Sequence, residues 1–405
     1  MKAALRSSAL VRAVTDAAGR WADADFPPRV RITGAIASRT GYSTPVVEYA
    51  LDRLFVPLDA ATLESVLAEE LGGLEALEGF VPRAGGIRAR AYPVGRVAIV
   101  SSETTIGVAL APAVFALCAG CSVLVKDRED ALIGAFFATL AEEYPELRAV
   151  ARAEHWTGGD ASPSDQALRF ADAVVAFGRD ATLAEIRGLL RPGARFVGYG
   201  HRATIGYLAR GSLDDEASAR RAARGAARDL VLYDGEGCMS LHALFVERGA
   251  TIDAERFAAT LIEEVETAAV EFPIVRIDPR ISPYLAGVAF RSALGAGGPR
   301  VFRTSGGDAT LVVDPPHRHA PPFLPRVLPI YTVEGPSECE EYVRSHGLPL
   351  EAFGTGDVDD AMRALGAALG AVRIARFGEL QAPSPSLPHG GRARVSDFVR
   401  WVASD

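Results

Sequence analysis

The pattern of apolar and polar positions changes near residue 90. Up to that point apolar residues recur every three or four positions with acidic residues between them, as in residues 60–71, which predicts amphipathic helices. Beyond it, short Val-rich runs alternate with segments of helical spacing. The runs predict strands at residues 96–101, 122–126, 149–155, 173–177 and 195–198, with helices at 108–119, 131–143 and 182–190. Such alternation indicates βαβ units and a parallel sheet, the usual setting of a nucleotide site.

A second alternation follows. A charged helix over residues 215–230 runs into a glycine loop, and a strand at 242–247 and a helix at 253–269 come after it. Further strands are expected at 300–303, 310–314, 326–333 and 372–375. The tail is rich in Pro and Ser and then has a helical pattern ending at Trp401. We therefore expect four regions: a helical N-terminal region (1–90) packing on the next domain, a nucleotide-binding domain (91–230), a catalytic domain (231–380) and a C-terminal tail (381–405).

Charge and hydropathy exclude several classes of function. The 405 residues include 43 basic and 51 acidic side chains, a net charge of −8 without a basic stripe, which argues against nucleic-acid binding. No apolar run approaches the roughly 18 residues that a membrane-spanning helix requires. Charged residues at short intervals in residues 1–26 interrupt any signal-peptide core, so we expect a cytoplasmic protein.

Three of the four cysteines can be interpreted from their sequence context. Cys118 and Cys121 form a lone CxxC that closes an apolar helix, and no second pair or suitable His cluster follows, so we interpret them as packing residues and expect no metal site. Cys238 is the best nucleophile candidate, because Gly235 and Gly237 leave the backbone free to turn sharply and approach a ligand. The attacking species is a thiolate, so such a site must favour it with amides, a helix end or a cation.

The first predicted strand is not followed by a GxGxxG fingerprint. A stretch of small hydroxyl residues, a glutamate and a glycine, residues 101–107, leads into the next helix instead. Such a stretch either receives a phosphate or an anionic intermediate, or is an ordinary helix start. Lys126, at the end of the second strand, is one of two lysines in the chain.

Several motifs in this order resemble the aldehyde dehydrogenase superfamily. Residues 95–100, 116–120 and 122–126 are similar to the opening of its cofactor domain. The resemblance implies an α/β, aldehyde dehydrogenase-like fold, with a Rossmann-type cofactor domain and an α/β catalytic domain. It also implies that Lys126 holds the adenosine ribose or its 2′-phosphate. Residues 156–160 and 176–180, the latter with Gly178 and Arg179, resemble the strand ends that flank the pyrophosphate.

Within that superfamily the chain resembles the LuxC-type acyl-CoA reductases. Gly237-Cys238-Met239-Ser240 matches their cysteine loop, and two C-terminal stretches match their tail, His389-Gly390-Gly391-Arg392 and Phe398-Val399-Arg400-Trp401. The resemblance implies NAD(P)H-dependent reduction of an acyl-CoA or acyl-carrier thioester to an aldehyde. Cys238 would carry the acyl group, CoA would leave, and the main-chain N–H of Cys238 would hold the oxyanion. The superfamily's habit also implies a homo-oligomer.

The chain departs from the superfamily at three positions. Residues 198–202 lack the glutamate that activates water, which favours transfer to a thiol, and the oxyanion-holding asparagine is absent because the chain has none. Glu103 falls near the place of that asparagine, and we assign it, Ser102 and Thr104 to the cofactor site. The glutamate of the nicotinamide ribose maps near Pro322. His201 either assists proton transfer or is a solvated loop residue.

These departures leave the cofactor and the reaction open. Lys126 and Arg128 favour NADPH, whereas Glu129 stands where a carboxylate favours NADH, and we favour NADPH. A reductase of another activated acyl donor, such as an acyl phosphate, is one alternative, and a catalytically inactive partner subunit is another. A cysteine hydrolase is disfavoured, since no spacing nominates the His and acid that it needs.

Overall fold

The computed structural model describes residues 6–102, 105–127, 131–156, 166–294, 298–314 and 319–405. Its contacts divide the chain into unit 1 (residues 1–40, 47–201 and 384–405) and unit 2 (residues 41–46 and 202–383). The sequence-based division stands at residues 230/231, whereas this one lies at His201–Arg202. The reason is that strand β8 (Ala203–Leu208) and helix α10 (Glu216–Val231) belong to unit 2.

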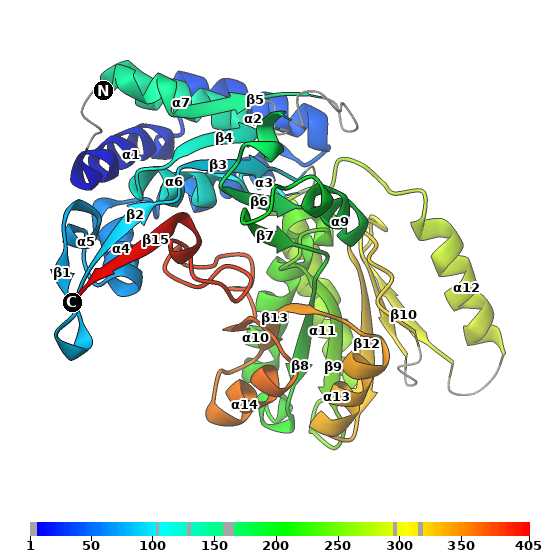
Figure 1. Cartoon of the computed structure of the whole chain (residues 1–405). Coiled ribbons are helices and arrows are strands. Elements are labelled where there is room, and N and C mark those ends of the chain that lie inside the picture. The colour runs from blue at the N-terminus through cyan, green and yellow to red at the C-terminus, as the bar shows by residue number, and fades with distance from the viewer. Residues whose placement is uncertain (1–5, 103–104, 128–130, 157–165, 295–297, 315–318) are drawn as a thin grey trace. The chain divides into compact units, whose positions relative to one another are not determined.

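Unit 1 contains a sheet of five parallel strands in the order β5-β4-β3-β6-β7 (Figure 1). The strands are β3 (Arg96–Val100), β4 (Ser122–Lys126), β5 (Ala151–Glu154), β6 (Ala173–Phe177) and β7 (Arg195–Tyr199). Helices of the same unit are α6 (Leu110–Cys118), α7 (Leu132–Glu143) and α9 (Asp180–Gly188). The strands and helices predicted for this part of the sequence are confirmed, close to their expected bounds.

Helices dominate the first part of unit 1, as the apolar spacing predicts. They are α1 (Ser7–Ala22), α2 (Pro27–Thr40), α3 (Thr44–Phe55, whose first turn belongs to unit 2), α4 (Ala60–Leu71) and the short α5 (Glu75–Glu78). Helix α1 contacts α4, α6 and α7. Its Trp21 is fully buried against the rings of Phe55 and Phe136, and the indole Nε1 donates a hydrogen bond of 3.0 Å to Thr139 Oγ1 on α7. The apolar face of α1 is therefore fixed to the helices around the sheet.

The end of the chain is a strand, and its predicted helix is wrong. Strand β15 (Val399–Ser404) pairs antiparallel with β2 (Arg88–Pro93), which also pairs with β1 (Val81–Pro82) (Figure 1). The Arg195 guanidinium donates to the main-chain oxygens of Ser396, Asp397 and Val399. The conformation of the tail thus depends on a partner strand some 300 residues away, which local periodicity does not reveal.

Unit 2 is built on a sheet of seven strands in the order β10-β11-β12-β9-β8-β13-β14, all parallel except β10, which runs antiparallel to β11. Besides β8 they are β9 (Leu241–Glu247), β10 (Arg300–Arg303), β11 (Thr310–Val313), β12 (Val327–Val333), β13 (Leu350–Thr355) and β14 (Arg373–Arg376). The helices besides α10 are α11 (Ala254–Glu271), α12 (Ile281–Ala293), α13 (Pro336–Ser345) and α14 (Asp360–Ala368).

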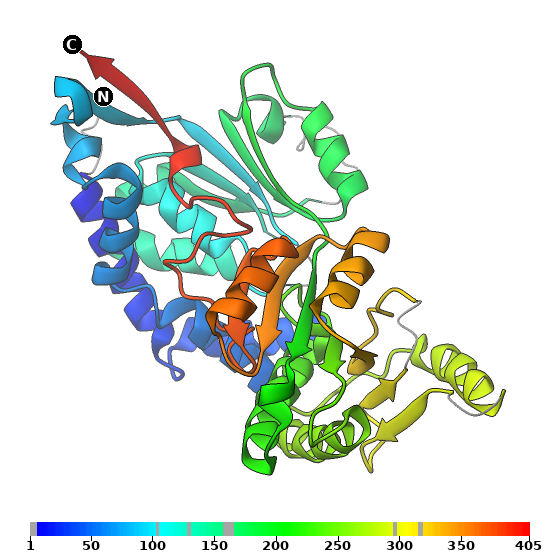
Figure 2. The ribbon, with the colours of Figure 1, turned by 90° about the horizontal axis from the view of Figure 1, so that it is seen from below.

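The helices of unit 2 differ in how they meet the sheet. Helix α10 packs on α11, which contacts β10, β11 and β12. Residues of α13 and α14 join one core cluster with Tyr207, Phe245 and Phe353. Helix α12 stands away from the sheet beside β10 (Figures 1 and 2). Strands β8 and β13, which sequence periodicity missed, are buried along their whole length. Among the described residues no helix is both long and apolar enough to cross a membrane.

Candidate functional site

Cys238 lies on a sharply bent loop between α10 and β9 in unit 2. Three successive residues, Tyr233, Asp234 and Gly235, have positive φ angles of 54°, 51° and 75°. Only glycine adopts this conformation without strain, so the two other residues must be held there by their surroundings. Gly235 thus allows the backbone to turn, as its position in the sequence predicts. Gly237 instead allows the backbone to approach the Ser240 side chain closely, since a Cβ there would lie 3.2 Å from Ser240 Oγ.

A buried arginine holds the bend. Arg326 has no exposed surface, and its Nε and one terminal nitrogen donate to Asp234 Oδ1 at 3.0 and 2.7 Å. The same guanidinium donates to the main-chain oxygens of Val231 and Phe272, and the Arg326 N–H donates to Asp234 O at 2.9 Å. The charge-assisted bonds to Asp234 are of the strong kind. They explain how a non-glycine residue is kept in the left-handed region.

A second set of contacts closes the loop on the side of Ser240. Its Oγ accepts from the Gly237 N–H at 3.1 Å and from Gln381 Nε2 at 2.7 Å. Gln381 Nε2 also donates to the main-chain oxygen of Asp229, and the side-chain Oδ2 of Asp229 accepts from the Gly378 N–H at 2.6 Å. Burial raises the pKa of Asp229 to about 8. The loop is therefore fixed by hydrogen bonds from two other parts of unit 2.

The Cys238 thiol itself is neutral in these surroundings. The residue is half-buried, and burial raises the pKa of the thiol to about 12, with a further rise from the negative charge of Glu351. The main-chain N–H groups of Cys238 and Met239 and the charge of Arg202 act in the opposite direction. Amides directed at the sulfur are also suited to an oxyanion that forms beside it. A proton acceptor is then needed to make the thiolate.

In unit 1 the candidate cofactor residues gather at one edge of the parallel sheet. The chain leaves β3 for β4 and β5 and then returns to the other side of β3 for β6 and β7, so the topological switch point lies between β3 and β6. Ser102 follows β3, and Gly178 and Arg179 follow β6. The Ser102 hydroxyl accepts from the Thr105 N–H at 3.3 Å, and Arg179 is exposed. Sequence reasoning thus placed all three at the edge where open α/β sheets bind ligands.

Lys126 ends β4 at the same edge. It is buried, with Nζ 5.0 Å from the centroid of the Trp156 ring. The neighbouring Asp127 accepts from the N–H groups of Ile133 and Gly134 at the start of α7. A buried ammonium, a hydroxyl and an exposed guanidinium on three strand ends have the donor chemistry that sugar hydroxyls and phosphates require.

Four of the predicted cofactor residues, Glu103, Thr104, Arg128 and Glu129, lie outside the described residues, as do residues 157–160. His201 is exposed and belongs to unit 1, whereas Cys238 belongs to unit 2, so its part in proton transfer stays a prediction. In the stretch without a water-activating glutamate, side chains pack closely around Gly198. A Cβ there would lie 2.9 Å from the Phe196 ring and 3.4 Å from Leu183, so a carboxylate side chain at this position requires the Phe196 ring to shift.

The C-terminal His-Gly-Gly-Arg stretch forms part of the edge in unit 1. His389 and Arg392 bond to each other through both main-chain pairs, with Gly390 and Gly391 at positive φ between them. This turn stacks the His389 ring on Tyr199, with centroids 4.3 Å apart, and Tyr199 on Phe177 at 4.8 Å. The stack lies at the ends of β6 and β7, and sequence reasoning had recognised the motif but not this contact.

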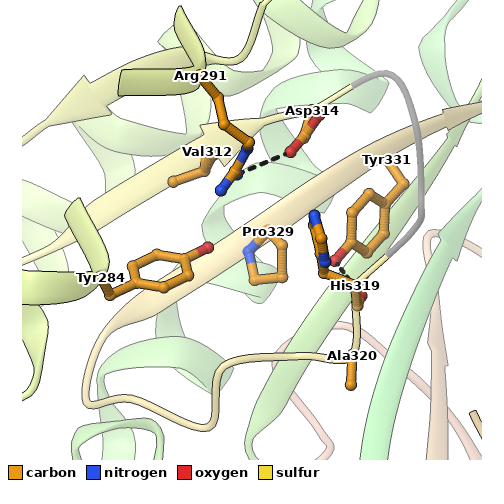
Figure 3. A pocket seen from close by; sticks show the side chains of 8 residues that line it. All are labelled: Tyr284, Arg291, Val312, Asp314, His319, Ala320, Pro329 and Tyr331. Carbon is orange, nitrogen blue, oxygen red and sulfur yellow. Dashed lines mark hydrogen bonds and ion pairs between the residues drawn. The ribbon is translucent and has the colours of Figure 1, made fainter. Parts of the chain in front are cut away.

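Two cavities lie apart from these residues. In unit 2, a cavity of about 230 Å³ is lined by Arg291, which pairs with Asp314 at 3.1 Å, and by Tyr331, whose hydroxyl donates to His319 O (Figure 3). In unit 1, a cavity of about 700 Å³ includes the first residues of β3 and β4. Neither lining contains Cys238 or a candidate cofactor residue. Within the described ranges no group of three His, Cys, Asp or Glu side chains is arranged to hold a metal ion.

The fold defines an aldehyde dehydrogenase-like protein. The chain is similar to aldehyde dehydrogenase 21 from Physcomitrella patens, in complex with succinate, at 14% identity and a TM-score of 0.67, covering 99% of this chain and 86% of the other. An oxidoreductase from Marinobacter aquaeolei gives 13% identity, a TM-score of 0.71 and coverages of 100% and 87%. The NADP complex of an NADP-dependent glyceraldehyde-3-phosphate dehydrogenase from Bacillus halodurans gives 15% identity and a TM-score of 0.67, covering 98% of this chain and 89% of the other. At these identities the likeness shows the fold alone.

The family follows from the sequence match. The model of the family described as "Acyl-CoA reductase (LuxC)" matches residues 3–401, so the chain belongs to the LuxC acyl-CoA reductase family. It is therefore an oxidoreductase, and the resemblance and fold class expected from its motifs are confirmed. A search of the curated proteins finds no match.

Proposed function

We propose that the protein reduces an acyl-CoA or acyl-carrier thioester to an aldehyde through an acyl group carried on Cys238, with NADPH preferred to NADH. The observation that carries the proposal is the cysteine loop. Its strained bend is held by Arg326 and its main-chain N–H groups are directed at the sulfur. Family membership supports the acyl-CoA donor.

The chemistry proceeds in two stages. The Cys238 sulfur attacks the thioester carbonyl, the N–H groups of Cys238 and Met239 hold the oxyanion, and the CoA sulfur departs. NADPH, when bound, supplies a hydride to the acyl carbon. The thiohemiacetal on Cys238 then collapses to aldehyde and cysteine. The absence of a carboxylate at Gly198 disfavours hydrolysis of the acyl-enzyme, which would otherwise compete with reduction.

The residues at the edge of the sheet of unit 1 support binding of a dinucleotide. Lys126 would hold the adenosine ribose or its 2′-phosphate, and Ser102 and Arg179 stand at the switch point for the pyrophosphate. In the sequence Arg128 follows Lys126 by two residues, and this pair of cations favours NADPH over NADH, whereas Glu129 opposes it.

The proposal is tested by incubating the protein with NADPH, and separately NADH, and acyl-CoAs of increasing chain length while nicotinamide absorbance is followed. We expect cofactor oxidation that disappears in Cys238→Ala and persists in Cys339→Ala, a matched control because Cys339 is fully buried on α13. An acyl phosphate is run as a second donor. Oxidation with acyl phosphate alone supports the alternative reductase, and no oxidation and no acyl adduct on Cys238 with any donor would support the inactive partner subunit.

A further inference from the structure

Strand β8 carries two register shifts at one residue. Against β13, Ala203 pairs with Leu350 and Thr204 with Ala352, so Glu351 is an extra residue on β13. Against β9, Thr204 pairs with Leu241 and Ile205 with Ala243, so His242 is an extra residue on β9. Bulges are uncommon between parallel strands and occur next to active sites, where they re-aim a side chain. Two of them flank Thr204.

Thr204 connects this irregular point of the sheet to the cysteine loop. Its hydroxyl donates a hydrogen bond of 2.7 Å to the main-chain oxygen of Cys238. Its N–H donates to Nδ1 of the buried His242 at 3.0 Å. Because that nitrogen accepts a bond, it carries no proton in this arrangement. Cys238 is therefore attached to the position of β8 beside which the bulge of β13 places Glu351.

Glu351 is a buried carboxylate with one close cation. Its side chain is 7% exposed, and Arg202 Nε lies 3.6 Å from Oε2. Arg202 is itself fixed to the bulge, since it donates to Leu350 O at 3.1 Å. Burial raises the pKa of Glu351, against the charges of Arg202 and Arg373. The charges of Glu351 and Arg202 both act on the Cys238 sulfur, with opposite signs. The Arg202–Glu351 pair and the cysteine loop thus meet at Thr204, which bonds the Cys238 carbonyl and lies beside the bulge that carries Glu351.

Resting on the function proposed above, we infer that Glu351 is the acid–base residue of the thiol site: it takes the proton of Cys238 and passes it to the leaving thiol. Arg202 positions the carboxylate. The site requires such a residue, because a buried neutral thiol attacks a thioester only if a nearby group accepts its proton.

With Glu351 as acid–base residue, every proton of the acyl transfer has a donor and an acceptor. As the Cys238 sulfur forms its bond to the acyl carbon, its proton moves to a Glu351 oxygen, directly or through one water. The carbon–sulfur bond of the donor then breaks, and the departing sulfur takes the proton from Glu351. The acyl-enzyme is left with Glu351 ionised. After hydride transfer the thiohemiacetal oxyanion collapses to aldehyde and Cys238 thiolate, which takes one proton from solvent.

A general base and a merely neighbouring charge predict opposite results for Glu351→Gln. Loss of the negative charge lowers the pKa of the thiol, so the thiolate forms at lower pH whichever role the carboxylate has. If Glu351 acted only as a charge, acyl transfer would then be faster. If it accepts the proton, acyl transfer slows by about 10²-fold, the usual contribution of general base catalysis.

The experiment compares wild type, Glu351→Gln, Glu351→Asp and Glu264→Gln. Glu264 is the matched control, because its side chain is also 7% exposed and pairs with arginines, Arg220 and Arg224, in unit 2. Thiolate absorbance is titrated as the difference from the corresponding Cys238→Ala protein. The single-turnover rate of acylation is followed by intact mass with acyl-CoA and, separately, with p-nitrophenyl acetate. Thermal melting shows which variants fold.

We expect Glu351→Gln to form thiolate at lower pH and yet to acylate about 10²-fold more slowly with both donors, with partial recovery in Glu351→Asp and none of this in Glu264→Gln. Acylation of Glu351→Gln at or above the wild-type rate would overturn the inference. If only p-nitrophenyl acetate acylates Cys238, and does so in a Glu351-dependent way, the inference stands and the proposed thioester substrate is wrong. If Glu351→Gln does not fold, a Glu351→Asp rate equal to wild type at every pH overturns it, and a slowed rate with unchanged melting supports it.

Discussion

Asp234→Asn isolates the charge that holds the bend before Cys238. Asparagine tolerates the left-handed conformation as aspartate does, so the substitution leaves the backbone at φ 51° without new strain. It removes the negative charge beside Arg326, whose guanidinium is completely buried and donates twice to Asp234 Oδ1. Because an unpaired buried charge typically costs about 3–5 kcal/mol and other acceptors remain for Arg326, we expect a loss near the lower end, about 3 kcal/mol.

The structure offers both a control and an assay for this effect. Asp308 lies 3.8 Å from the other terminal nitrogen of Arg326 and is partly exposed, so Asp308→Asn is expected to cost less than about 1 kcal/mol. The three tryptophans, Trp21, Trp156 and Trp401, all belong to unit 1. In urea titrations, far-UV circular dichroism therefore reports both units and tryptophan fluorescence reports unit 1 alone.

We expect Asp234→Asn to lower the urea midpoint of the circular dichroism transition. If unit 1 unfolds independently of unit 2, the urea midpoint of the tryptophan fluorescence transition stays at the wild-type value. A loss below about 1 kcal/mol, or an equal loss in Asp308→Asn, would refute the assignment of Arg326 and Asp234 as the clamp of the cysteine loop. Faster alkylation of Cys238 in Asp234→Asn than in Asp308→Asn would show in addition that the clamp shields the thiol.

Three further predictions concern other parts of the chain. Because Asp229 is protonated in the fold up to about pH 8 but ionises near pH 4 when unfolded, its contribution to stability falls as pH rises through that window, by up to about 6 kcal/mol. Asp229→Asn should flatten the dependence of the urea midpoint on pH between 5 and 8, and an unchanged slope would contradict the assignment. Lys126→Met should raise the KM for NADPH about 10- to 100-fold, by loss of a charge-assisted bond, with a smaller change in kcat; an unaltered KM would exclude Lys126 from the cofactor site. Gly390→Ala should destabilise unit 1 by about 1–3 kcal/mol, since Gly390 has a φ of 55° and the new Cβ would lie 2.7 Å from the Tyr199 ring, and tryptophan fluorescence in urea measures it.

Local periodicity predicted the elements in which apolar residues recur at a regular spacing. The five strands of the parallel sheet of unit 1 and the helices between them follow from such runs. Strand β8 was missed because it follows directly on the loop that ends β7, and both β8 and β13 are buried on each face, so neither has an alternating pattern. Because β8 was missed, the sequence-based division at residues 230/231 also differs from the division of contacts at residues 201/202. The terminal strand β15 was mistaken for a helix because its partner β2 is distant in sequence.

The residues of the candidate site also differ in whether local sequence features reveal them. Cys238 was proposed as the nucleophile because its glycines and its motif are local. Ser102 was assigned to the cofactor site because it follows a predicted strand, and Lys126, Gly178 and Arg179 because their strand ends resemble the superfamily's cofactor domain. Arg326, which holds the bend, is 92 residues from Asp234 and stands at the start of an apolar run, so nothing near it marks it as part of the loop.

Glu351 and His242 did carry a signal that periodicity analysis passes over: each is a polar residue inside a strand whose neighbours are all buried. A polar side chain in such a place must have a partner, or it would destabilise the fold. Here the partners are Arg202 for Glu351 and the Thr204 N–H for His242, and each polar residue is the extra one of a bulge. A sheet that needed only to pack would keep apolar residues in regular register at this point. Two departures from regular pairing, both beside the residue that bonds the Cys238 carbonyl, are better explained by the chemistry of the thiol than by the stability of the sheet.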